Sequence, residues 1–247
     1  MKGALEAARY LTIVPVGGRR TTVGAAPGRA VAWFPAIGLL IGAVLVIVDR
    51  LVAWAFPMLL AALLTVTTWK LMTGGLHLDG LADCLDALGG HDPSQRLMIM
   101  RDSRIGAFGA IGLILFLLLE LAAVAELAST PRWRALLTAP CVARAMPALL
   151  ARWFPSARSE GQGARFQADV TPRAVAVALG CAVVVSVAVL GVAGIAAVVV
   201  AGLTSVAVAR FMTTRLGGVT GDVLGAAVEL AELAVLLTVS AWTHVPR

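Results

Sequence analysis

The stretch Ala174–Ala209 contains 36 consecutive residues without a charged side chain. A helix that crosses a membrane needs about 20 mainly apolar residues, so this stretch is long enough for two crossings with a turn near Gly191–Gly194. The rest of the chain is similar, because 60% of its 247 residues are hydrophobic, only 14% are charged and the mean hydropathy is +0.91. Average soluble domains are about 45–50% apolar and about 25% charged. The sequence therefore predicts an all-α fold, a polytopic membrane helix bundle.

Seven membrane-spanning helices are predicted from the apolar runs. Besides the two halves of Ala174–Ala209, the candidates are Val31–Val48, Leu51–Trp69, Ile105–Ala128, Ala135–Trp153 and Val223–Trp242. The fourth candidate is the weakest, because it contains Arg144 and Pro147. We expect the whole chain, residues 1–247, to form one integral-membrane domain in the lipid bilayer.

The positions of Lys and Arg predict the orientation of these helices. If the N-terminus is cytoplasmic, 15 of the 20 Lys and Arg residues fall in cytoplasmic segments and 4 on the opposite side, while Arg144 lies within a span. Cytoplasmic loops of membrane proteins carry such an excess. The sequence therefore predicts a cytoplasmic N-terminus, with every long polar loop on the cytoplasmic face. The same asymmetry explains the net charge of +6 without a nucleic-acid partner.

The segment TGGLHLDGLADCLDALGG, residues 73–90, gathers carboxylates in an otherwise apolar chain. Asp79, Asp83 and Asp86 are spaced i, i+4 and i+7, which places them within roughly 60° of arc on one face of an α-helix. Like charges on one stripe repel each other, especially near a membrane. A divalent cation offsets this repulsion, and Mg²⁺ is commonly held by one or two carboxylates together with substrate phosphates. The stripe predicts a Mg²⁺ site, and the alternative is a solvated acidic helix face.

His77 lies two residues before Asp79, so on a continuous helix its side chain points away from the acidic stripe. A histidine here is a candidate general base or phosphate hydrogen-bond donor, and the alternative is an interfacial histidine without a catalytic role.

A second polar segment, RLMIMRDSRIGAFGAIG, spans Arg96–Gly112 just before the third predicted span. Arg101 and Arg104 suit phosphate recognition, because a guanidinium group binds oxyanions with two parallel hydrogen bonds. Gly106 and Gly109 leave room for a ligand near a positive helix end. An ordinary positively charged membrane flank is the alternative, although it does not require Asp102 and Ser103.

A third segment, RLGGVTGDVLGAAVELAE, spans Arg215–Glu232. Asp222 follows Thr220-Gly221, so we expect it to cap a helix and in addition to contact substrate. Acidic residues inside a membrane usually face the bundle interior or a cavity, and Glu229 is the candidate for such a cavity. Arg144 needs a partner, for which Glu229, Glu120 and a phosphate are the options.

Together, the sequences GGLHLDGLADCLDALGG, MIMRDSRIGAFG and GGVTGDVLGAAVELAE resemble the three motifs of the cobalamin synthase family, the adenosylcobinamide-GDP ribazoletransferases, in order and approximate spacing. The resemblance covers most of the chain. It implies a Mg²⁺-dependent enzyme of the cytoplasmic (inner) membrane that joins adenosylcobinamide-GDP to α-ribazole or its 5′-phosphate. The products would be adenosylcobalamin, or its 5′-phosphate, and GMP.

For a reaction of this kind, we hypothesise roles for individual residues that the resemblance itself does not establish. The metal ligands would be Asp79, Asp83 and Asp86; the substrate contacts would be Arg101, Ser103, Arg104, Asp222 and Glu229; and His77 or Asp102 would deprotonate the ribazole hydroxyl that attacks phosphorus. Two other classes stay open, a CDP-alcohol-phosphatidyltransferase-like enzyme and a cation-coupled transporter. A transporter would more naturally centre its charges at the membrane midplane. The sequence does not fix the oligomeric state.

Overall fold

The computed structural model of the protein describes residues 2–15, 27–160 and 162–245. Within them the chain is helical and contains no named strand, which confirms the predicted all-α class. An isolated bridge pairs Ser156 with Val219. The elements are α1 (Lys2–Leu11), η1 (Pro27–Trp33), α2 (Phe34–Ala55), α3 (Met58–Met72), α4 (Leu76–Asp86), η2 (Ala87–Gly89), α5 (Pro93–Ile99), α6 (Ala107–Glu126), α7 (Ser129–Trp153), α8 (Gln162–Asp169), α9 (Pro172–Leu190), α10 (Val192–Leu216) and α11 (Gly221–His244).

Among the described residues, six helices are long and apolar enough to cross a membrane: Gly28–Ala55, α6, α7, α9, α10 and α11. A seventh crossing exists only if α3 and α4 are counted together, and these two helices meet at an 89° bend. The predicted membrane bundle is therefore confirmed at six to seven spans. The predicted turn within Ala174–Ala209 is also confirmed, because α9 ends at Leu190 and α10 begins at Val192.

The predicted span Leu51–Trp69 is wrong. The chain leaves α2 at Ala55, turns at Phe56–Pro57 and begins α3 at Met58. The 15 residues of α3 cover about 22 Å at a rise of about 1.5 Å per residue, which is less than the hydrocarbon core of about 30 Å. The apolar composition continues through the turn, so hydropathy did not reveal where the helix stops.

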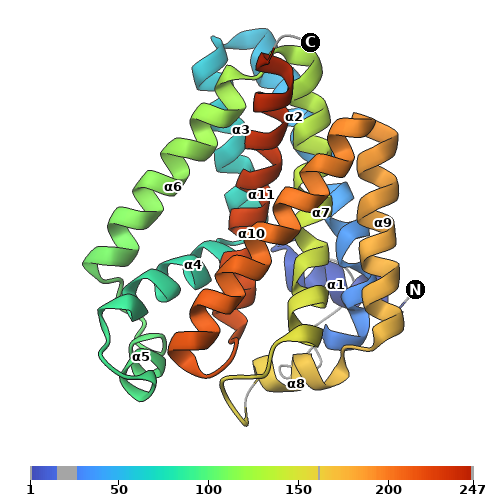
Figure 1. The fold of residues 1–247 in the computed structure, drawn as a ribbon. Coiled ribbons are helices and arrows are strands. Elements are labelled where there is room, and N and C mark those ends of the chain that lie inside the picture. Colours follow the sequence, from blue (N-terminus) through green and yellow to red (C-terminus); the bar gives the residue numbers. More distant parts are fainter. Residues whose placement is uncertain (1, 16–26, 161, 246–247) are drawn as a thin grey trace.

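Helices α7 and α11 form the centre of the bundle, as Figure 1 shows, with α6, α9 and α10 nearer its outside. The most apolar stretches of α7 and α11 are 89% and 78% buried inside the protein, compared with 28% for that of α6 and 22% for that of α9. The outer helices expose large apolar side chains such as Leu115, Val184 and Leu203. Such faces suit lipid, whereas the charged residues of α7 and α11 must find partners inside the protein.

Asp49 and Arg132 show how charges are satisfied inside the bundle. Asp49 lies between the predicted spans Val31–Val48 and Leu51–Trp69, and Arg132 is one of the four residues assigned above to the side opposite the cytoplasm. Both are buried, and Arg132 Nη2 lies 2.5 Å from Asp49 Oδ1. Thr65 of α3 also donates a hydrogen bond to Asp49. Because the pair is satisfied internally, α2 continues to Ala55 without a break.

Lys70 follows the predicted span Leu51–Trp69 and is one of the 15 residues assigned above to cytoplasmic segments, and this assignment is wrong. Its side chain is buried at the end of α3, and its Nζ lies 2.8 Å from Glu120, 2.6 Å from Glu229 and 3.2 Å from Glu232. These carboxylates come from α6 and α11, so Lys70 fixes the end of α3 against two other helices.

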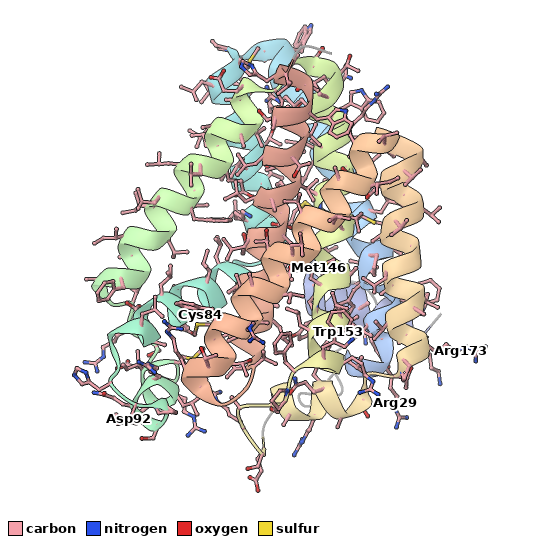
Figure 2. All side chains as sticks on the ribbon, viewed as in Figure 1. Arg29, Cys84, Asp92, Met146, Trp153 and Arg173 are labelled. Carbon is pink, nitrogen blue, oxygen red and sulfur yellow. The ribbon has the colours of Figure 1, made fainter. Side chains whose placement is uncertain are left out.

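The short helices α1, α4, α5 and α8 gather at the end of the bundle opposite the C-terminus (Figure 1). Figure 2 shows Arg29, Asp92 and Arg173 at the same end. Helix α4 has only 11 residues, and its last residue, Asp86, is hydrogen-bonded to the first turn of α6. It therefore lies at the level where α6 begins.

Candidate functional site

The bend between α3 and α4 depends on two glycines. Gly74 and Gly75 have φ angles of 63° and 67°, a left-handed conformation that side chains with a Cβ adopt at a steric cost. The Gly75 N–H donates to the carbonyl of Lys70 at 3.0 Å, which closes the last turn of α3. The Thr73-Gly74-Gly75 turn thereby directs α4 across the end of the bundle.

Asp79 and Asp83 of α4 line a cavity of about 810 Å³ at this end of the bundle. Asp222, in the first turn of α11, lines the same cavity. Residues separated by about 140 positions in the sequence thus contribute carboxylates to one space. The predicted helical stripe is confirmed as a helix, and Asp222 is brought to it as the expected substrate contact requires.

The carboxylates of this cavity repel each other. Burial, followed by the nearby carboxylates of Asp79, Asp222 and Asp86, raises the pKa of Asp83 to about 7, whereas Arg158 opposes this shift. A bound cation would relieve the repulsion and favour the ionised carboxylate. The oxygen ligands available here are the type that Mg²⁺ prefers. Asp79 and Asp83 therefore fit a divalent ion that substrate phosphate oxygens would help to coordinate.

Asp86 has different partners from the other two aspartates. Its Oδ2 accepts a hydrogen bond from the Gly106 N–H at 2.7 Å, and its Oδ1 accepts one from the Gly109 N–H at 2.8 Å. These donors lie at the start of α6, where backbone N–H groups lack helical partners. The structure gives Asp86 a helix-capping role that the sequence analysis did not predict. The hypothesis of a metal site consequently rests on Asp79 and Asp83.

The residues predicted to bind phosphate, Arg101, Ser103 and Arg104, line the same cavity as the aspartates. Arg104 is exposed and donates three side-chain hydrogen bonds to Asp102: from Nε to Oδ1 at 3.0 Å, from Nε to Oδ2 at 3.1 Å, and from Nη2 to Oδ2 at 2.6 Å. These bonds lower the pKa of Asp102 to about 2. A general base works best with a pKa near the working pH, so Asp102 is better suited to orienting Arg104 than to taking a proton.

His77 is buried in the first turn of α4 and lines a second cavity of about 370 Å³. Burial, with contributions from the positive charges of Arg144 and Lys70, holds the pKa of its imidazole well below the usual value. The imidazole is therefore neutral at neutral pH. Its Nδ1 has no hydrogen-bond partner among the described residues. Because burial and the positive charges oppose its protonation, this atom suits a hydrogen bond to substrate better than proton transfer.

Asp222 was expected to cap α11, but Thr220 performs this role. The Thr220 hydroxyl accepts from the Val223 N–H at 3.2 Å and donates to Asp222 at 3.2 Å. Asp222 is thereby held in the first turn of α11, where it lines both cavities. Asp79 also lines both, so these two carboxylates form part of the wall that the cavities share.

Glu229 is not brought together with the other predicted site residues. It is buried against Lys70 and lines neither cavity. Arg144 pairs with Glu232, which was not among its expected partners. Glu120, Glu229 and Glu232 are close enough to share a cation, but the Lys70 ammonium group already lies within 3.2 Å of all three. This cluster therefore stabilises the bundle next to the site.

Sequence reasoning missed the contribution of α1 and α8. Arg9, Tyr10, Thr12 and Ile13, in and just after α1, line the larger cavity, and Phe166 of α8 lines the smaller one. The Ile13 N–H donates to the Met72 carbonyl at 2.9 Å, which ties the end of α1 to the end of α3. The alternation of apolar and charged residues in KGALEAARYL was an available signal for an amphipathic helix.

The fold and the site define a polytopic membrane protein with an acidic cavity and adjacent arginines at one end of its helix bundle. The comparisons with known proteins are more specific, because the cobalamin-5-phosphate synthase family matches residues 3–240. The chain belongs to that family.

Similar relatives include the adenosylcobinamide-GDP ribazoletransferase of Herpetosiphon aurantiacus, which is 42% identical over 98% of this chain and 97% of the relative. The protein of that name from Geotalea daltonii is 38% identical over 95% of each chain. That of Citrobacter koseri is 42% identical over 85% of this chain and 86% of its own. No solved structure matches significantly.

Proposed function

We propose that this protein joins adenosylcobinamide-GDP to α-ribazole, or to its 5′-phosphate, and releases GMP in a Mg²⁺-dependent reaction. Membership of the family and the names of the relatives support the reaction. The observation that carries the proposal is one cavity lined by Asp79, Asp83 and Asp222 as well as by Arg101 and Arg104. Carboxylates for a metal next to guanidinium groups for phosphate suit the transfer of a phosphoryl group.

In the proposed reaction, the hydroxyl oxygen of the acceptor forms a bond to the donor phosphorus that remains with cobinamide. The bond between that phosphorus and the GMP oxygen breaks, and its electron pair leaves with GMP. His77 Nδ1, which has no hydrogen-bond partner among the described residues, accepts a hydrogen bond from the acceptor hydroxyl, and the hydroxyl proton is released to solvent as the bond to phosphorus forms. Arg101 and Arg104 neutralise charge on the phosphate oxygens. When bound by Asp79 and Asp83, Mg²⁺ would stabilise the charge on the pyrophosphate.

We further propose that the protein resides in the cytoplasmic (inner) membrane with both cavities open to the cytoplasm. The concentration of arginines at the cavity end of the bundle supports this orientation. The family match favours the ribazoletransferase reaction over the two alternatives, a CDP-alcohol phosphatidyltransferase and a cation-coupled transporter.

A transfer assay on the purified protein in detergent tests the proposal. With adenosylcobinamide-GDP, α-ribazole and Mg²⁺, we expect GMP and adenosylcobalamin in equal amounts by chromatography. Chelation with EDTA should stop the reaction, and added Mg²⁺ should restore it. If no GMP forms with Mg²⁺, the proposed reaction is wrong, and if EDTA has no effect, the metal requirement is wrong.

A further inference from the structure

The two cavities share a wall but differ in size and chemistry. Tyr10, Leu76, Asp79 and Asp222 line both. The larger cavity, of about 810 Å³, is bordered by the Arg101–Arg104 segment, whereas the smaller, of about 370 Å³, is bordered by α8 and the start of α11. Two substrates that react with each other need adjacent sites that meet at the reacting atoms. A shared wall of carboxylates provides such a meeting point.

The smaller cavity has an aromatic side. The rings of Tyr10 and Phe34 stack with centroids 5.8 Å apart and an interplanar angle of 17°. Phe34 and Phe166 continue the stack at 6.1 Å and 27°. All three rings line this cavity, although they come from α1, α2 and α8. An aromatic side of this kind favours a planar heteroaromatic ligand, which gains from apolar burial and from stacking on Tyr10, the exposed ring of the three.

The same cavity has two polar side chains with buried atoms that form no hydrogen bond. Nε and Nη2 of Arg158 are buried without a hydrogen-bond partner among the described residues, and so is Nδ1 of His77. The His77 side chain is more than nine-tenths buried. Buried polar atoms are normally hydrogen-bonded, so unpaired atoms in a cavity indicate a ligand that completes them. The Arg158 guanidinium interacts electrostatically with the carboxylates of Asp83 and Asp222. Its Nε and Nη2 atoms nevertheless form no hydrogen bond to the described residues, which leaves them for an anionic ligand such as a phosphate.

Arg158 is held next to the shared wall by the chain that precedes it. The Ala157 N–H donates to the Val219 carbonyl at 3.0 Å, and the Val219 N–H donates to the Pro155 carbonyl at 2.8 Å. The Ser156 hydroxyl also donates to the carbonyl of Arg158 at 2.8 Å. Because Val219 lies just before α11, these bonds bring Arg158 close to Asp222. The side chain is therefore positioned by the fold and does not belong to a freely solvated loop.

We propose that the smaller cavity is the acceptor site, in which Tyr10, Phe34 and Phe166 hold the planar base and Arg158 binds the 5′-phosphate of the acceptor. This inference rests on the proposed function, in which the acceptor is a benzimidazole riboside or its phosphate. A cavity of about 370 Å³ is near the lower end of the range of about 300–1,000 Å³ for small-ligand sites, which suits a nucleotide and not a corrinoid. The larger, arginine-lined cavity is left for the pyrophosphate of the donor.

The shared wall also agrees with an acceptor in the smaller cavity. A base that lies against the aromatic side places its ribose between Arg158 and the shared wall. The acceptor hydroxyl then faces the donor cavity across the wall formed by Asp79 and Asp222, and His77 lines only the acceptor side.

Steady-state kinetics of the purified, full-length protein test the proposal with three substrates: α-ribazole, α-ribazole 5′-phosphate and adenosylcobinamide-GDP. For Arg158→Gln, we expect the KM for α-ribazole 5′-phosphate to rise about 10- to 100-fold, since one charged hydrogen-bonding group is lost. The KM values for α-ribazole and for the donor should stay within about twofold of wild type. Arg158→Lys should recover part of the loss. Arg152→Gln, at an exposed position that lines neither cavity, is the matched control.

A second variant tests the aromatic side independently. Phe166→Leu should raise the KM for both acceptor forms about 2- to 10-fold and leave the KM for the donor unchanged. If a variant is inactive, its Kd for α-ribazole 5′-phosphate is measured instead, by calorimetric titration of the folded protein with this acceptor alone. The proposal is overturned if Arg158→Gln raises the KM for the donor and not the KM for α-ribazole 5′-phosphate. It is also overturned if neither variant changes the KM for an acceptor. A wild-type protein that makes no GMP would refute the proposed function itself, which is a distinguishable result.

Discussion

Lys70 places a positive charge among three buried carboxylates immediately before the α3–α4 bend. Its Nζ contacts Glu120, Glu229 and Glu232. A buried charge without its partner is strongly destabilising, because its desolvation is no longer offset. At the scale of single residues, this cluster holds the end of α3 against α6 and α11, next to the glycine turn from which α4 presents Asp79 and Asp83.

We therefore predict that Lys70→Met lowers the free energy of unfolding by about 3–5 kcal/mol, because three acidic groups lose their shared partner. The measurement is the thermal unfolding midpoint of the purified protein in detergent. Lys2→Met, the same change at the other lysine of the chain, is exposed and should leave the midpoint unchanged. An equal midpoint for both variants would show that the buried cluster does not stabilise the fold.

The roles of single acidic residues were only partly predictable from the sequence. The spacing of Asp79, Asp83 and Asp86 correctly predicts a helix, because helical periodicity is a local property. It does not predict that Asp86 accepts hydrogen bonds from Gly106 and Gly109, because these donors lie 20 and 23 residues away. The pairing of Glu229 with Lys70 is more distant still, at 159 residues.

At the scale of whole helices, α4 packs closely against the start of α11. A Cβ added at Gly80 would lie 2.7 Å from the Asp222 carbonyl oxygen and 2.9 Å from the Asp222 Cα. The backbones of the two helices therefore touch at this point. The contact sets the distance between the aspartates of α4 and the carboxylate of Asp222, which together line the larger cavity.

Gly80→Ala should force α4 away from α11, because both close atoms belong to the backbone and cannot rotate aside. We expect a loss of about 1–3 kcal/mol in stability, which is typical of overpacking, and a lower rate of GMP release. The control is Gly202→Ala in α10, where an added Cβ meets nothing within 4 Å. Melting midpoints and initial rates of both variants provide the comparison. If Gly80→Ala matches Gly202→Ala in both, the close contact does not position the site.

The elements themselves were predicted with different success. Long apolar runs predicted α6, α7, α9, α10 and α11, with ends that differ from the observed ones by several residues. These helices were predictable because a spanning helix must be apolar along its length. The break at Pro57 was missed, since apolar residues lie on both sides of it. Helices α1 and α8 were missed because they are short and of mixed polarity.

The whole molecule is polarised along its axis, with both cavities and the helices α1, α4, α5 and α8 at one end (Figure 1). The uneven distribution of Lys and Arg predicted this arrangement, although Lys70 and Arg132 proved to be internal. The asymmetry remains without these two residues, because it depends on the many arginines of the connecting segments.

Cysteine labelling in cells tests the proposed orientation. Ser94, in α5, and Thr130, at the start of α7, are both exposed and lie at the two ends of the bundle. In a Cys181→Ala background, a membrane-impermeant maleimide should label Thr130→Cys in intact cells, and Ser94→Cys only in inverted membrane vesicles. The background protein should stay unlabelled, since Cys84 and Cys141 are buried. The reverse pattern would place the cavities on the outer face.

The Mg²⁺ dependence of GMP release most directly tests whether α4 holds the metal for phosphoryl transfer. We expect Asp83→Asn to require more than about tenfold more Mg²⁺ than wild type for half-maximal rate, because a charged oxygen ligand becomes neutral. Asp92→Asn, the same change at an exposed helix cap that asparagine also suits, should retain the wild-type requirement. Equal Mg²⁺ requirements for the three proteins would contradict the assignment of the metal site to α4.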